Sequence, residues 1–85
     1  MKIYYFYHHM YLTQADYDEV KDAIKTKNYE KFRELQKKFN SVGEQKGWGK
    51  ESFLPSTFFD GKRCKDIKIT QENIGEIEDI EWECG

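Results

Sequence analysis

The chain has few of the features that carry crosslinking, membrane insertion or common cofactor chemistry. Proline occurs once, at Pro55, and cysteine twice, at Cys64 and Cys84. No apolar run approaches the roughly 18 residues that cross a bilayer, and the spacings CxxC and HExxH are absent. No glycine-rich loop has a known phosphate-binding spacing. These absences exclude a membrane-spanning helix and disfavour both a zinc site of common spacing and a nucleotide-binding loop.

The N-terminal sequence and the cysteines indicate an intracellular protein. The first residues contain one lysine followed by rings and histidines, without the aliphatic segment and small-residue cleavage site of a secretory signal. Two cysteines in such a chain more often stay reduced than form a disulfide. We therefore expect a cytoplasmic protein, and the sequence leaves open whether Cys64 and Cys84 ever pair.

Aliphatic residues are also scarce, whereas aromatic residues make up 16% of the 85-residue chain. A chain of this length forms one domain, over 1–85, and buries only about 60–65% of the surface of its unfolded form. A small core built from a few large rings leaves no room for a deep substrate cavity. We therefore expect a non-enzymatic protein that needs no cofactor.

The pattern of apolar residues predicts a single α+β domain. The ring-rich residues 2–11 predict an interior strand, and Thr13 and Asp16 form a capping box for a helix over 14–26. Asn28 caps a second helix over 29–42, which we expect Gly43 to end. Strands follow at 53–59, 62–69 and 77–84. The resulting β-α-α-β-β-β order predicts a mostly antiparallel sheet with both helices on one face.

Two details of the strands carry further expectations. Pro55 indicates that the second strand either lies at an edge or begins only after it. The dipeptide Asp60-Gly61 is the strongest hairpin signal in the chain.

His8 and His9 are the only histidines. Neighbouring residues of a strand point to opposite faces, so the pair cannot chelate one metal ion as a unit. We therefore predict no metal site. Catalysis by either histidine has no nucleophile motif to support it, and Cys64 is more simply explained as part of a solvated basic turn.

The charge distribution is uneven. Residues 1–69 hold 14 basic and 10 acidic groups, whereas residues 70–85 hold six acidic groups and no basic one. We interpret the chain as a small protein–protein interaction module, of the kind that phages or mobile elements encode as inhibitors. It would occlude a protein partner through an aromatic sheet face and an acidic C-terminal surface, and homodimerisation is compatible with this. The expected contact residues are Tyr5, Tyr7, Tyr11, Glu76, Glu78, Asp79, Glu81 and Glu83.

A binder of single-stranded RNA or DNA is the alternative. Tyr5 and Tyr7 would stack bases, while Lys62, Arg63 and Lys65, which flank Cys64, would neutralise phosphates. Against this, basic and acidic residues are interleaved along the chain, and the isoelectric point is about 5.7. Nucleic acid is therefore the second choice of partner.

Overall fold

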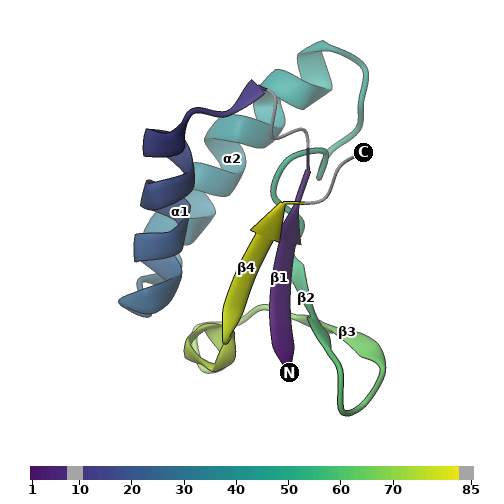
Figure 1. Ribbon diagram of the computed structural model, residues 1–85. Helices are drawn as coiled ribbons and strands as arrows, with labels where there is room; N and C mark the ends of the chain where they lie inside the picture. The colour runs from purple at the N-terminus through teal and green to yellow at the C-terminus, as the bar shows by residue number, and fades with distance from the viewer. Residues whose placement is uncertain (8–10, 83–85) are drawn as a thin grey trace.

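The structure is a computed structural model, and it describes residues 1–7 and 11–82. Its elements are β1 (Lys2–Phe6), α1 (Gln14–Lys25), α2 (Tyr29–Gln45), β2 (Thr57–Asp60), β3 (Lys65–Lys68), the short 3₁₀ helix η2 (Ile74–Glu76) and β4 (Asp79–Trp82). The strands form one sheet in the order β3-β2-β1-β4. The pairs β1–β2 and β2–β3 are antiparallel, and β1–β4 is parallel. Both helices lie on the same side of the sheet (Figure 1). The predicted α+β class and mostly antiparallel sheet are confirmed.

Local sequence signals account for the two helices. The side chain of Thr13 accepts a hydrogen bond from the amide of Asp16, and the Asp16 carboxylate accepts one from the amide of Thr13. Asn28 caps α2 by accepting from the amide of Lys31. Between the helices Lys27 has a φ of 59°, and the amide of Asn28 donates to the carbonyl of Ala23, which closes the C-terminus of α1. The two helices thus form a hairpin.

The expected end of α2 at Gly43 was wrong. The helix continues to Gln45, and Gly43 is buried within it. A Cβ at Gly43 would lie 1.6 Å from the hydroxyl oxygen of Ser52, so glycine is needed there for close packing of a loop against the helix. The helix ends at Gln45, and the φ of 80° at Gly47 allows the amide of Trp48 to donate to the Gly43 carbonyl and close the helix.

All four strands are shorter than predicted within the described residues. β1 ends at Phe6, although the amide of Tyr7 still donates to the Phe53 carbonyl. β2 begins at Thr57, so the second of the two expectations raised by Pro55 is the correct one. β2 lies inside the sheet, between β3 and β1. β4 begins at Asp79, two residues later than expected; His8 and His9, as well as Glu83 and Cys84, lie outside the described residues.

The β2–β3 hairpin forms where Asp60-Gly61 predicted it, but its loop is longer. Asp60 pairs with Lys65, which leaves four residues in the connection instead of two. The left-handed residue is Cys64, with a φ of 52°. β3 therefore begins at Lys65, three residues later than the sequence indicated.

The core lies between the helices and the covered face of the sheet. Five of its nine largest fully buried side chains are rings, as the aromatic composition predicted: Tyr4, Phe6, Phe32, Phe53 and Phe58. Tyr4 and Phe32 meet edge to face at 5.5 Å between ring centroids, and Phe6 stacks on Tyr17 of α1 at 5.4 Å. In the part of the chain that the structure describes, every helix is too short or too polar to cross a membrane.

Candidate interaction surface

The face of the sheet away from the helices carries a cluster of partly exposed apolar side chains. Residues alternate between faces along a strand, so Ile3 and Tyr5 point away from the helices when Tyr4 and Phe6 point toward them. Ile3 pairs with Phe59 on β2, and all three of these open-face residues are partly buried. We call Ile3, Tyr5 and Phe59 the apolar row.

The register places carboxylates directly beside the apolar row. Ile3 pairs with Asp79 and Tyr5 pairs with Glu81, and both acidic residues are exposed. Paired residues of adjacent strands point to the same face, so Asp79 and Glu81 flank the rings on the β4 side. Neither residue forms an ion pair within residues 1–7 and 11–82. The open face therefore combines apolar area with uncompensated negative charge.

The outer edge of β4 is closed by side chains. The amide of Gly61 donates to the Met1 carbonyl, so odd residues of β1 bond toward β2 and even ones toward β4. In the parallel register, Ile80 then turns its amide and carbonyl away from β1. The Ile80 amide donates to the Asp79 carboxylate at 2.9 Å, and the Tyr17 hydroxyl donates to the Ile80 carbonyl at 3.0 Å. These bonds satisfy the amide and carbonyl of Ile80, which are outward main-chain groups to which another strand would bind.

The phenol of Tyr17 lies in a negative local field. Partial burial raises the pKa of Tyr17 above its usual value, and the charges of Asp79, Asp18 and Glu81 raise it further. The hydroxyl therefore remains a hydrogen-bond donor to Ile80 throughout the neutral range.

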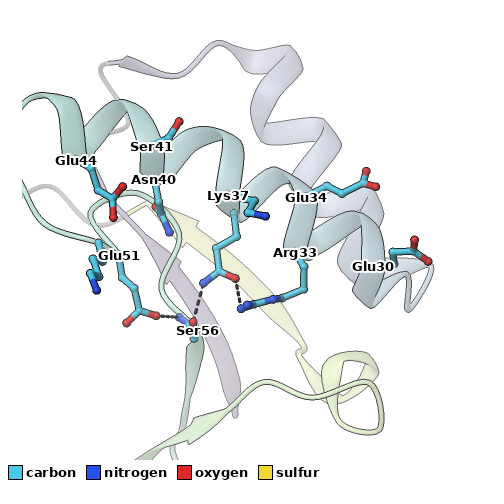
Figure 2. Close-up of a pocket in the computed structure, with 11 residues that line it drawn as sticks. Glu30, Arg33, Glu34, Lys37, Asn40, Ser41, Glu44, Glu51 and Ser56 are labelled. Atoms are coloured by element: carbon cyan, nitrogen blue, oxygen red, sulfur yellow. Dashed lines mark hydrogen bonds between the residues drawn. The ribbon is translucent and has the colours of Figure 1, made fainter.

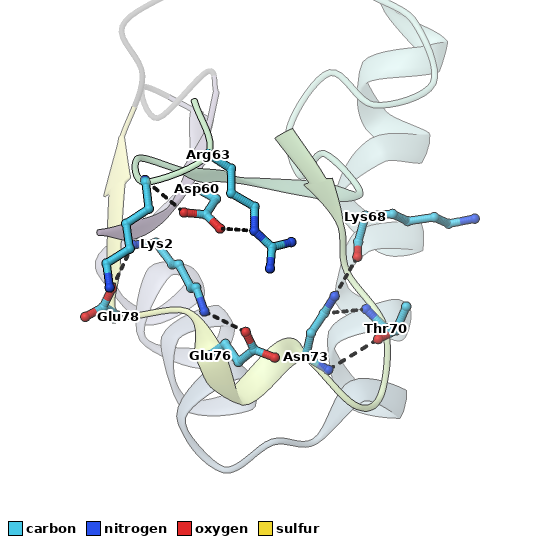
Figure 3. Close-up of polar contacts among 9 residues, drawn as sticks. Lys2, Asp60, Arg63, Lys68, Thr70, Asn73, Glu76 and Glu78 are labelled. Carbon is cyan, nitrogen blue, oxygen red and sulfur yellow. Dashed lines mark hydrogen bonds and ion pairs between the residues drawn. The ribbon is translucent and has the colours of Figure 1, made fainter. Parts of the chain in front are cut away.

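Glu76 and Glu78, two of the predicted contact residues, are bonded to Lys2 at the start of β1. The Lys2 ammonium donates to Glu76 at 2.7 Å, which raises the pKa of Lys2, and the Lys2 amide donates to Glu78 at 2.8 Å (Figure 3). Both residues are exposed, and both are bonded to Lys2, whereas the register pairs Asp79 and Glu81 with the apolar row. Glu83, the last predicted acidic contact, is outside the described residues.

The structure separates the predicted tyrosines. Tyr5 is on the open face, and Tyr7 lies just beyond the end of β1, partly buried. Tyr11 does not extend the strand; its ring meets Trp48 at 5.1 Å, and the Lys46 ammonium lies 5.4 Å from its centroid. Trp48 also contacts the buried ring of Phe53. Of the three predicted tyrosines, Tyr5 alone therefore lies on the open face of β1.

The basic residues of the nucleic-acid alternative do not meet the tyrosines. Lys62 and Arg63 lie in the β2–β3 loop, where Arg63 is 3.8 Å from the Asp60 carboxylate (Figure 3). Lys65 pairs with Asp60, which pairs with Lys2, so this loop is at the start of β1. Tyr5 is three residues farther along the strand, or about 10 Å, and Tyr7 lies beyond it. Stacking rings and phosphate-neutralising cations are thus not adjacent.

A concave region lies between α2 and the loop that precedes β2. Its volume is about 630 Å³, and its lining is polar (Figure 2). Gln36 on its floor donates to the Leu54 carbonyl and the Ser56 hydroxyl, and accepts from Arg33. These contacts hold the loop on the helix. Sequence analysis did not anticipate this groove, because its walls come from segments far apart in the chain.

Residues that could bind metal or act as nucleophiles do not converge in the described structure. Among residues 1–7 and 11–82, no group of three His, Cys, Asp or Glu side chains is placed to hold a metal ion. Cys64 is an exposed free thiol whose sulfur lies 3.5 Å from the Gly61 carbonyl oxygen.

The sequence interpretation missed Ile3 and Phe59 as parts of the candidate surface. Ile3 is two residues from Tyr5 and shares its face, but only tyrosines and acidic residues were predicted to make contacts. Phe59 follows buried Phe58, and nothing in two adjacent phenylalanines says which one points outward.

Comparison with protein-family models, curated proteins and solved structures gives no match. The surface must therefore be interpreted from its own residues.

Proposed function

We propose that this protein is a non-enzymatic interaction module that binds a basic surface of a protein partner through its open sheet face and thereby occludes that surface. The apolar row would form the centre of the contact, and Asp79 and Glu81 would set partner choice and encounter rate. The mechanism is steric: one folded domain covers a surface that the partner needs.

The observation that carries this proposal is the pairing of Tyr5 with Glu81 and of Ile3 with Asp79 on one uncovered face. Tyrosine contributes a large amphipathic contact area at small entropic cost, and exposed carboxylates favour a cationic partner. The core on the opposite face is complete without these side chains, so they are available for a contact.

A capture experiment tests the proposal. The tagged protein is used to capture partners from lysate of its native cells, and the bound proteins are quantified by mass spectrometry. Two variants address the surface: Tyr5→Ala, and Asp79→Asn combined with Glu81→Gln. Asparagine at position 79 retains an oxygen that can accept from the Ile80 amide, so the edge of the sheet stays closed. We expect each variant to reduce capture of a specific partner at least about tenfold.

The matched control is Glu19→Gln with Glu34→Gln. It removes the same charge from exposed positions on the two helices and should leave capture unchanged. A partner whose capture is equal for the wild-type protein and both surface variants would contradict the proposal.

Nucleic-acid binding is tested on the same proteins. Tight binding of a fluorescent single-stranded oligonucleotide, weakened steeply by salt and by Lys62→Ala with Arg63→Ala, would replace the protein partner with nucleic acid. The absence of binding at low salt would remove that alternative.

A further inference from the structure

We infer that the partner segment received by the open face is a basic amphipathic helix, lying along β1, and not an added strand. This inference rests on the proposed function, because it identifies the kind of partner that the same surface would accept. Three features of the described residues support it: the closed edge of β4, the spacing of the apolar row and the one-sided position of the acidic residues.

The closed edge disfavours strand addition. A peptide that extends a sheet obtains its affinity from main-chain hydrogen bonds to an open edge. At β4, the Asp79 carboxylate and the Tyr17 hydroxyl already bond the outward amide and carbonyl of Ile80. At β3, the side-chain amide of Asn73 donates to the Lys68 carbonyl at 2.8 Å and so occupies one of the outward main-chain groups of that edge (Figure 3). A partner is therefore directed to the face of the sheet, where side chains make the contact.

The spacing of the open face matches a helix. Residues two apart on a strand, such as Ile3 and Tyr5, are about 6.7 Å apart along it, and residues four apart on a helix rise about 6 Å. β1 has five residues, which corresponds to about 11 residues of a helix lying parallel to it. Apolar side chains at i and i+4 of the partner would then contact Ile3 and Tyr5 in turn. Helices already cover the other face (Figure 1), so this arrangement would place a helical layer on each face of the sheet.

The charges specify the sequence of such a helix. Asp79 and Glu81 have the same two-residue spacing and flank the apolar row on the β4 side. Lys or Arg at i and i+4, on a stripe beside the apolar one, would lie opposite them. On the β3 side, Phe59 pairs with Asp66 while Lys68 pairs with Thr57, so the charge there is mixed. The strong negative flank is on one side only, which favours one placement of the helix across the sheet.

The test uses synthetic peptides and the intact protein. The probe is a fluorescein-labelled helical peptide of about 16 residues, with leucines at i and i+4 spacing and lysines on one adjacent stripe. A second peptide has the same composition with the order scrambled, so that it keeps its charge but loses the apolar stripe. A third has alternating leucine and lysine, the pattern of a strand. Binding is measured by fluorescence anisotropy, and the bound site by amide chemical-shift changes.

The expected result is that the helical peptide binds at least about tenfold more tightly than the other two peptides, with shift changes centred on β1 and β4. Tyr5→Ala, and Asp79→Asn with Glu81→Gln, should each weaken binding by about tenfold, and the helix-surface control Glu19→Gln with Glu34→Gln should not. The circular dichroism spectrum checks that each variant is folded.

Tighter binding of the alternating peptide, equal binding of the scrambled peptide, or no binding of the helical peptide would each overturn the inference. A homodimer formed through this face, detected by sedimentation at the same protein concentrations, would also overturn it, since a second copy would then be the occupant. If the cellular partner is still lost in the Tyr5→Ala variant while no helical peptide binds, the proposed function stands and only the helical form of the partner is wrong.

Discussion

The two faces of the central strand β1 carry the same kinds of residue but differ in burial. Tyr4 and Phe6 are fully buried, whereas Ile3 and Tyr5, their immediate neighbours, are partly exposed. The difference arises from the helices, which pack on one face only (Figure 1). Aromatic content therefore does not by itself distinguish core from contact surface; the element packed against a face decides this.

The two faces also differ in how their polar groups are bonded. On the covered side, the Tyr4 hydroxyl donates to the Pro55 carbonyl at 2.7 Å, and burial raises the pKa of Tyr4 well above its usual value. On the open side, Asp79 and Glu81 remain exposed beside the rings. A buried hydroxyl that is bonded within the fold gains nothing from a partner, while a face that keeps exposed charge beside apolar area can still gain from one.

The largest expected effect separates Phe58 from Phe59, adjacent residues on opposite faces of β2. Phe58→Ala should lower the free energy of unfolding by about 3–5 kcal/mol, because the ring is fully buried and its removal leaves a cavity. Phe59→Ala should cost about 1–2 kcal/mol, because its ring is only partly buried. Urea denaturation of the two variants measures both values.

This pair is its own control, since the substitution, the strand and the neighbouring sequence are shared. Equal destabilisation would mean that the open face is as much a part of the core as the covered one. The contrast between the faces, and with it the candidate surface, would then fail.

The sequence was sufficient for the features that depend on short-range signals. The capping box at Thr13, the Asn28 cap and the Asp60-Gly61 hairpin each need only a few neighbouring residues, and each is present. The interior position of β1 followed from rings on both of its faces. A strand was expected in the acidic segment 77–84, and β4 forms there.

The features that failed depend on residues distant in sequence. Gly43 looked like a helix stop because its contact with Ser52, across the following loop, cannot be read from α2 alone. The tyrosines looked like one row because the position at which β1 stops pairing depends on β4 and on Phe53. For the same reason, the sequence did not reveal the pairing of Ile3 with Asp79. This pairing places the acidic strand β4 along one side of the apolar row.

A second prediction concerns how the covered side is held together. Asn40 of α2 is buried; its oxygen accepts from the amides of Phe53 and Leu54, and its nitrogen donates to the Leu54 carbonyl. Asn40→Ala should lower the free energy of unfolding by about 2–3 kcal/mol, because buried main-chain groups lose their partners. Thermal and urea denaturation measure the loss.

Ser41→Ala is the matched control for Asn40→Ala. Ser41 is the next residue on the helix, exposed, and its hydroxyl bonds only within α2, to the Lys38 carbonyl. It should change stability by less than about 0.5 kcal/mol. If Asn40→Ala were equally mild, the loop before β2 would be held by its apolar side chains alone. The hydrogen bonds of Asn40 would then not be a difference between the covered side and the open face.

The smallest effect concerns Asp60, the one charged residue that is buried within residues 1–7 and 11–82 and that lies at the rim of the covered face. Burial alone would raise the pKa of Asp60. Hydrogen bonds from the amides of Lys62 and Arg63, with the charges of Lys2 and Arg63, outweigh burial and hold the pKa below its ordinary value of 3.8. The folded protein therefore binds this proton more weakly than the unfolded chain does.

A lowered pKa means that the stability contributed by Asp60 is fully present above about pH 4 and is lost as the pH falls through the pKa of the folded state. In Asp60→Asn, position 60 cannot titrate. The difference in unfolding free energy between wild type and variant should therefore shrink as the pH is lowered from 5 to 2 in steps of about one unit. Asp66→Asn, which removes an exposed carboxylate from the edge strand β3, is measured in parallel as the control. A difference that stays constant over this range would show that Asp60 contributes through shape and hydrogen bonding alone, and that the covered face tolerates charge no differently from the open one.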